Sequence, residues 1–186
     1  AQKEMGGGIL GALGVHLFDA AEWLLGSVTE LNAKAGTTIK ERPDPVTGQM
    51  KPVTSEDHAT VDMKTADGVP IHLALTNVDP RGTGMSILLK GEKGTLVLES
   101  TSKEYGRGLR VKETIEGQSP VFYQAENPPE GLDARIPPFQ SLAARLVIAV
   151  QKGDRSFRPS FLEGVRSQLF LEGVRTSNEK GSWITL

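Results

Sequence analysis

The sequence predicts an α+β domain in which a largely antiparallel open sheet has helices packed on one face. Three observations support this prediction. A segment with helical spacing of apolar residues opens the chain at residues 8–25, segments with alternating apolar and polar residues follow, and two more segments with helical spacing end it. Short turns join the alternating segments, and hairpins in series produce antiparallel sheets. Helices segregated from strands along a chain are typical of α+β folds.

Residues 8–25 are predicted to form the first helix. One stripe at helical spacing contains Leu10, Leu13, Gly14, Leu17, Ala21 and Leu24. The opposite side is also mostly apolar, with Ile9, Ala12, Ala20 and Trp23. A helix that is apolar nearly all round is buried, so we expect this one to lie inside the domain and to end at Gly26.

Alternation with a period of two predicts the strands. The first covers residues 28–42, and a loop rich in proline follows it. The next two, at residues 59–65 and 71–75, flank Asp67-Gly68, a dipeptide typical of tight hairpins. The remaining segments of this part are three further strands and one long irregular stretch, at residues 85–89, 96–98, 109–115 and 116–138.

Two helices are predicted to end the fold. The first begins at Pro137 and Pro138, since a missing N–H costs nothing in the first helical turn, and it ends at Gly153. The second begins with the capping-box spacing of Ser160 and Glu163 and continues to about residue 175.

The last predicted helix contains an internal repeat. Residues 161–167 (FLEGVRS) recur as residues 170–176 (FLEGVRT), at an offset of nine residues. At about 100° per residue this offset places the two copies on opposite faces of one helix. A stacking repeat needs a whole supersecondary unit per copy, so we interpret this one as a coincidence within a single helix.

Length and composition limit the class of protein. The 186 residues (20.0 kDa) correspond to about one domain, and we expect residues 1–186 to form a single one. The net charge of −2 argues against nucleic acid or a membrane as partner. No apolar run approaches the ~20 residues of a membrane span. The absence of cysteine excludes a disulfide framework and a thiolate metal site, and it suits a reducing, cytoplasmic compartment.

His16, in the first predicted helix, is the main candidate for chemistry. Imidazole gives and takes protons near neutral pH, which suits general acid–base catalysis. Asp19 follows three positions later on a neighbouring part of the same face, where a carboxylate could orient a ligand. Two structural alternatives remain open: His16 as a hydrogen-bonded core histidine, and Asp19 as a solvated or capping carboxylate.

Other candidate sites have less support. His58 and His72 are expected on paired strands, but no two histidines have the local spacing of metal ligands, so no metal site is predicted. Gly6-Gly7-Gly8 opens a helix, as in anion sites. It does not match the dinucleotide fingerprint G-x-G-x-x-G and no predicted strand precedes it, so no cofactor-binding residue is expected in this chain.

Two motifs near the start resemble a known family. The residues GGGILGALGVHLFD at positions 6–19, followed by WLLG at positions 23–26, resemble the opening of the C-terminal domain in the Gfo/Idh/MocA oxidoreductases. This is the family of glucose–fructose oxidoreductase and inositol dehydrogenase. Three later stretches are also similar to it, so the resemblance covers nearly the whole chain: Glu56-Asp57, residues 91–96 (GEKGTL) and the end from Pro159 to Trp183.

The resemblance implies that this chain is the C-terminal substrate and oligomerisation domain of a longer enzyme. The family's N-terminal Rossmann domain binds NAD or NADP and carries a Glu-Lys-Pro motif. Both are absent from this chain, which begins at Ala1, so the fragment alone is expected to bind no cofactor and to be inactive. The implied reaction is hydride transfer at a sugar or cyclitol hydroxyl. His16 would then be the catalytic or substrate-binding residue, with Asp19 as a second substrate ligand.

One position departs from the family's pattern. Many members carry Asp four residues before the histidine, one helical turn away, where this chain has Ala12. The change favours a substrate-orienting role for His16 over an acid–base role. It also keeps open a non-catalytic alternative, a ligand-binding or scaffold protein with the same fold. In either case the helix-free face of the sheet would be large and partly apolar, so we expect a homo-oligomer through that face.

Overall fold

The computed structural model describes residues 2–80, 82, 84–100, 102 and 106–186. These form two compact units, one made of Ala1–Pro80 and Pro159–Leu186, the other of Arg81–Arg158. All strand pairings among the described residues are antiparallel. The predicted α+β class is therefore confirmed.

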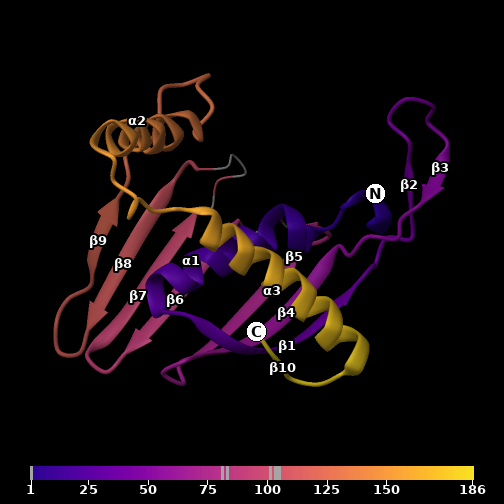
Figure 1. Ribbon diagram of the computed structural model, residues 1–186, viewed down its shortest axis with the longest axis horizontal. Helices are drawn as coiled ribbons and strands as arrows, with labels where there is room; N and C mark the ends of the chain where they lie inside the picture. Colours follow the sequence, from indigo (N-terminus) through magenta and orange to yellow (C-terminus); the bar gives the residue numbers. More distant parts are fainter. Residues whose placement is uncertain (1, 81, 83, 101, 103–105) are drawn as a thin grey trace. The chain divides into compact units, whose positions relative to one another are not determined.

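The first unit is a four-stranded sheet with two helices over one face (Figure 1). The strand order is β10-β1-β4-β5. The bounds of its strands and helices are β1 Val28–Gly36, β4 His58–Thr65, β5 Pro70–Thr76, β10 Ile184–Thr185, α1 Val15–Leu25 and α3 Phe161–Lys180. Phe18 of α1 and Phe170 of α3 stack with 4.5 Å between ring centroids and are fully buried against Leu31 and Val61 of the sheet. This is the hydrophobic core of the unit.

The first helix differs from its prediction in two ways. It begins as a π-helix, Leu10–Gly14, before the α-helix α1, and a short 3-10 helix, Lys3–Met5, precedes both. The expectation that the helix is buried all round is wrong: Ile9, Leu10 and Phe18 are buried, but Trp23 is 83% exposed. Apolar residues on both sides therefore did not mean burial on both sides. The predicted end at Gly26 is confirmed, with its N–H bonded to the Glu22 carbonyl.

The first predicted strand is split in two. β1 ends at Gly36, and the chain then turns into a separate hairpin of β2 (Glu41–Pro43) and β3 (Met50–Pro52). β2 contains the last two residues of the predicted strand, whereas β3 lies in the predicted loop. The turn is held by the buried Asp57 carboxylate, which accepts hydrogen bonds from the backbone N–H groups of Thr38 and Ile39. A side chain that is distant in the sequence thus ends the strand, although the alternation of apolar and polar residues continues beyond Gly36.

Side chains of α3 complete the outer edge of β1. The short strand β10 pairs only with Glu30 and Leu31. Beyond it, the N–H of Ala33 donates to Ser177 Oγ at 2.9 Å, and the N–H of Ala35 donates to Asn178 Oδ1 at 2.9 Å. Backbone groups that would otherwise form an open edge are therefore satisfied by a helix.

The second unit is a four-stranded meander with one helix. The strand order is β6-β7-β8-β9. The bounds are β6 Met85–Gly91, β7 Gly94–Ser100, β8 Leu109–Ile115, β9 Val121–Gln124 and α2 Ile136–Lys152. The first three strands and α2, with Pro137 and Pro138 in its first turn, agree with the prediction. β9 lies in the stretch that was expected to be irregular.

The internal repeat of α3 lies on one helix, as predicted, and its two copies have opposite environments. Phe170 and Val174 of the second copy are fully buried, whereas Phe161 is 96% exposed and Val165 is 53% exposed. The predicted capping box of Ser160 and Glu163 is present. The helix continues five residues beyond the predicted end, to Lys180.

The repeat provides a matched pair of substitutions. Phe170→Ala leaves a cavity between α1, α3 and the sheet, so we expect the free energy of unfolding to fall by about 3–5 kcal/mol. Phe161→Ala removes the same side chain from the exposed copy and should change stability by less than about 0.5 kcal/mol. Urea unfolding of both variants measures the difference. Equal effects of the two substitutions would contradict the packing described here.

Candidate functional site

His16 lies on the outward face of α1. Its side chain is exposed, whereas Phe18, two positions and about 200° further round the helix, is fully buried. The alternative of a hydrogen-bonded core histidine is therefore wrong. Because Phe18 anchors the opposite side of the helix to the core, the His16 imidazole faces away from the sheet that supports it.

Three other exposed residues share the outward face of α1 and its π-helical start. Ala12 precedes His16 by four positions, Asp19 follows it by three, and Trp23 follows Asp19 by four, a spacing that aligns side chains on a helix. No described residue hydrogen-bonds or ion-pairs with the His16 ring or the Asp19 carboxylate. The two groups predicted for the site therefore lie along one face but do not bond to each other.

The inner side of α1 is tied to the other elements by an ion pair. Glu22 Oε1 lies 2.5 Å from Arg166 Nη2 of α3, and the same oxygen accepts the N–H of Val28 at the start of β1. Arg166 also donates to the Val28 carbonyl. These bonds connect α1, α3 and β1 and fix the orientation of the helix that carries His16. Neither residue was predicted from the sequence.

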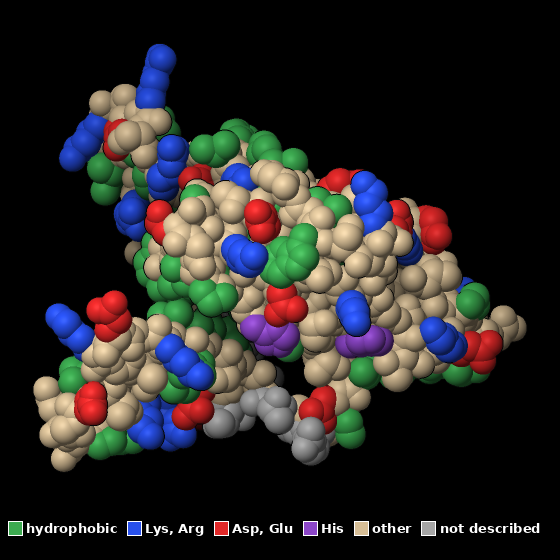
Figure 2. Space-filling view, turned by 90° about the horizontal axis from the view of Figure 1, so that it is seen from below, with side chains coloured by type: hydrophobic (Ala, Val, Ile, Leu, Met, Phe, Trp, Pro, Cys, Tyr) green, Lys and Arg blue, Asp and Glu red, His purple; other side chains and the backbone are tan. Residues whose placement is uncertain are grey.

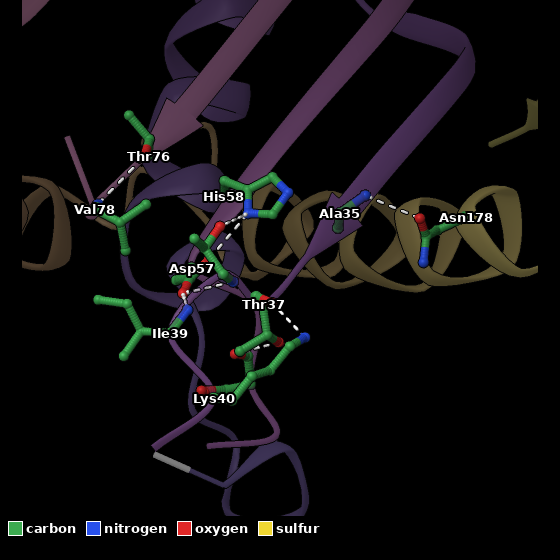
Figure 3. Close-up of polar contacts among 11 residues, drawn as sticks. Ala35, Thr37, Ile39, Lys40, Asp57, His58, Thr76, Val78 and Asn178 are labelled. Carbon is green, nitrogen blue, oxygen red and sulfur yellow. Dashed lines mark hydrogen bonds and ion pairs between the residues drawn. The ribbon is translucent and has the colours of Figure 1, made fainter. Parts of the chain in front are cut away.

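A second polar cluster surrounds Asp57, at the end of β1 and the start of β4 (Figure 3). The His58 ring Nδ1 lies 2.9 Å from Asp57 Oδ1, and the N–H groups of Thr38 and Ile39 donate to the same carboxylate. Burial by itself raises the pKa of the Asp57 carboxyl. The hydrogen bonds from Ile39, His58 and Thr38 outweigh burial and hold that pKa well below its usual range. We interpret the role of this Asp57 cluster as structural, because it stabilises the turn after β1.

The three histidines do not form a common site. His72 Nδ1 lies 2.7 Å from Asp62 Oδ1 on the neighbouring strand, an exposed pair, and His58 is bonded to Asp57. β4 and β5 are paired as expected, but Thr76, not His72, lies opposite His58. Over the described part of the chain, no group of three His, Cys, Asp or Glu residues is arranged to hold a metal ion.

A cavity of about 550 Å³ in the second unit is lined by residues 107 and 130–133. Arg107 is its largest charged side chain. Its guanidinium donates to the carbonyls of Pro128, Pro129 and Leu132, at 2.7–2.9 Å. Asp133 in the lining is bonded to Arg135, which holds the pKa of that carboxyl at about 2. These groups stabilise the loop before α2, so the cavity is not a better candidate for the functional site than the exposed face of α1.

On the face shown in Figure 2, acidic and basic side chains are interspersed, in keeping with the net charge of −2. Among the described helices, none is long and apolar enough to cross a membrane.

Comparison with known families identifies the domain. Residues 1–97, just over half of the chain, match the family model of the GFO/IDH/MocA C-terminal domain. The chain belongs to this family. The match contains the π-helix, α1 with His16 and Asp19, and the Glu56-Asp57 segment, so the predicted resemblance is confirmed.

Two kinds of relatives extend the comparison. An uncharacterized oxidoreductase, sll0816 of Synechocystis sp. (strain ATCC 27184 / PCC 6803 / Kazusa), is 35% identical over 192 residues, which cover 100% of this chain and 52% of the relative. A solved structure of levoglucosan dehydrogenase in complex with NADH and L-sorbose superposes with a TM-score of 0.78 at 23% identity, covering 97% of this chain and 51% of that one. The chain thus spans about half the length of these relatives.

The same fold also occurs in a protein that is not named as a dehydrogenase. The super-repressor mutant of Gal80p from Saccharomyces cerevisiae matches with a TM-score of 0.75 at 16% identity, over 96% of this chain and 49% of that one. At this identity the similarity concerns the fold alone. The fold therefore does not decide between catalytic and non-catalytic roles.

The Asp57 cluster predicts that the free energy of unfolding depends on pH. Its folded-state pKa lies below the unfolded value of about 3.9, so its contribution is complete above that value and is lost as the pH falls below it. Asp57→Asn should lower the free energy of unfolding by about 2 kcal/mol at pH 7, and the difference from wild type should shrink below about pH 4. Urea unfolding between pH 3 and 7 measures this dependence.

Asp67→Asn is the matched control for this prediction, because Asp67 is exposed in the turn between β4 and β5. It should unfold like wild type across the range. A difference between Asp57→Asn and wild type that stays constant down to pH 3 would show that the carboxylate charge does not contribute.

Proposed function

We propose that this chain is the C-terminal substrate-binding and oligomerisation domain of a longer NAD(P)-dependent oxidoreductase that acts on a hydroxyl of a sugar, cyclitol or related compound. The observation that carries the proposal is the placement of His16. It lies in the family's histidine motif, on a rigid helix, exposed and with no partner among the described residues. A histidine in that state is available to a ligand.

The described residues do not themselves fit a dinucleotide site. Dinucleotide-binding folds need parallel strands joined by a helix, whereas the ladders described here are antiparallel. Gly6-Gly7-Gly8 follows a 3-10 helix rather than a strand. We therefore assign NAD or NADP to the rest of the parent protein, and to this chain the contacts with the substrate.

In this scheme His16 holds the substrate hydroxyl and accepts its proton when the alcohol is oxidised, or returns it in the reverse direction. Asp19, one turn along the same exposed face, accepts a hydrogen bond from a neighbouring hydroxyl. Ala12 supplies no carboxylate to stabilise an imidazolium, so the orienting role of His16 carries more weight than in relatives with Asp there.

The proposal predicts the effect of His16→Ala in the full-length parent protein. Sugars and cyclitols are screened by nicotinamide absorbance, and the variant is compared with wild type. We expect kcat to fall about 100-fold or more, because the variant loses both the orientation of the substrate hydroxyl and its proton acceptor, with cofactor affinity unchanged. Gln49→Ala, which changes an exposed residue in the loop between β2 and β3, is the control and should keep wild-type activity.

Two results would contradict this role. Full activity of His16→Ala would remove His16 from the chemistry. A wild-type protein that binds cofactor but turns over no substrate would instead favour the second candidate, a non-catalytic ligand-binding or scaffold protein. The presence of Ala12 on the face of His16 is the observation that favours this second candidate.

For the assembly we propose a homo-oligomer through the helix-free face of the sheet β10-β1-β4-β5. For this sheet of the first unit, the expectation of a partly apolar face needs correction. Its side chains are mainly polar or charged, with Lys64 placed 3.7 Å from Glu30 and over the ring of Trp183. Asp62 and His72 lie on the same face. Charges of both signs on one face allow a complementary contact between two copies.

A contact of this kind should depend on salt. We expect light scattering to show more than one copy at low ionic strength, and association should weaken towards 1 M salt because exposed charges are screened. Lys64→Glu should weaken it further, whereas Lys93→Glu, in the turn between β6 and β7, should not. A monomer at high protein concentration and low salt would contradict the proposal.

A further inference from the structure

Glu56 joins the start of the His16 helix to the segment before β4. Its backbone carbonyl accepts the N–H of Ile9 at 3.0 Å, and its carboxylate Oε1 accepts the N–H of Leu10 at 3.2 Å. N–H groups in the first turn of a helix have no partner within the helix, and a carboxylate there also complements the positive end of the helix dipole. Glu56 therefore satisfies two consecutive donors at the start of this helix.

Gly8 provides the space that this contact needs. A Cβ at Gly8 would lie 2.0 Å from Glu56 Oε1 and 2.4 Å from its Cδ. The backbone of Gly8 has a φ of +134°, which L side chains rarely adopt. Any other residue at position 8 would displace the carboxylate. Position 8 is thus adapted to hold the Glu56 side chain against the helix.

The wide turn that follows leads directly to His16. Leu10–Gly14 is a π-helix, a rare element whose turn contains more residues than an α-helical turn and which frequently occurs at functional sites. Both of its ends are fixed: Glu56 holds Leu10 on one side, and Phe18 anchors α1 in the core on the other. His16 lies between these anchors, so the hold of Glu56 on Leu10 limits how the His16 turn can rotate.

We propose that Glu56 is a positioning residue for His16, acting through the N–H of Leu10 and the π-helical turn. The role rests on the function proposed above for His16. Glu56 touches neither substrate nor cofactor in this scheme. Its carboxylate keeps the first turn in register, so that the imidazole meets the substrate hydroxyl in one orientation.

The test compares three substitutions in the full-length protein. Glu56→Ala removes the acceptor, and we expect kcat to fall about tenfold through misplacement of His16, with the KM for the cofactor unchanged. Glu56→Gln keeps a side-chain oxygen for the Leu10 N–H and should recover most of the activity. Glu41→Ala, an exposed glutamate on β2, is the control and should behave as wild type. If Glu56→Ala does not fold, Glu56→Asp withdraws the acceptor by one methylene.

Hydrogen exchange measured by mass spectrometry gives a second readout that does not depend on turnover. Peptides covering residues 8–16 should exchange faster in Glu56→Ala and at the wild-type rate in Glu56→Gln and Glu41→Ala. Unchanged exchange in Glu56→Ala overturns the proposal. So does full activity of Glu56→Ala together with an inactive His16→Ala. If His16→Ala itself is fully active, the proposed function of His16 fails, and the exchange data still show whether Glu56 holds the turn.

Discussion

The stacked rings of Phe18 and Phe170 are the contact on which the first unit depends. They join the only two helices described over this sheet and lie fully buried against it. The Glu22–Arg166 pair beside them adds bonds to the start of β1. Because dispersion and apolar burial hold one side of α1 and hydrogen-bonded charges hold its end, the other side of the helix is free to carry exposed residues. His16 occupies that other side.

Two consecutive carboxylates then organise the chain around this core. Glu56 satisfies N–H groups at the start of the His16 helix, and Asp57 satisfies N–H groups in the turn that ends β1. The two residues act on segments that lie earlier in the chain, 46 positions before Glu56 at Leu10 and 18 to 19 positions before Asp57 at Ile39 and Thr38. A helix start and a strand end are thus set by one short segment, which helps to explain why Glu56-Asp57 is part of the resemblance to the family.

The proposed functional site is an exposed helix face and not an enclosed pocket. His16 and Asp19 lie on an open helix face, and the chain spans about half the length of its relatives. In the proposed function, a second surface of the longer protein brings cofactor and substrate to this face. In the proposed function, Ala12 leaves this face without the carboxylate that the family's pattern places there, which favours substrate orientation by His16 over proton transfer.

The sequence by itself determined the α+β class, most helices and strands, the capping box and the family, because these depend on local periodicity, caps and short motifs. Tertiary structure alone decided which residues are buried. Phe161 and Phe170 occupy equivalent places in two nearly identical local sequences, yet Phe161 is exposed and Phe170 is fully buried. Tertiary structure likewise decided which side of α1 is exposed, where β1 ends and which backbone groups Glu56 binds. Each of these features depends on a residue that is distant in the chain, and local sequence patterns do not identify that residue.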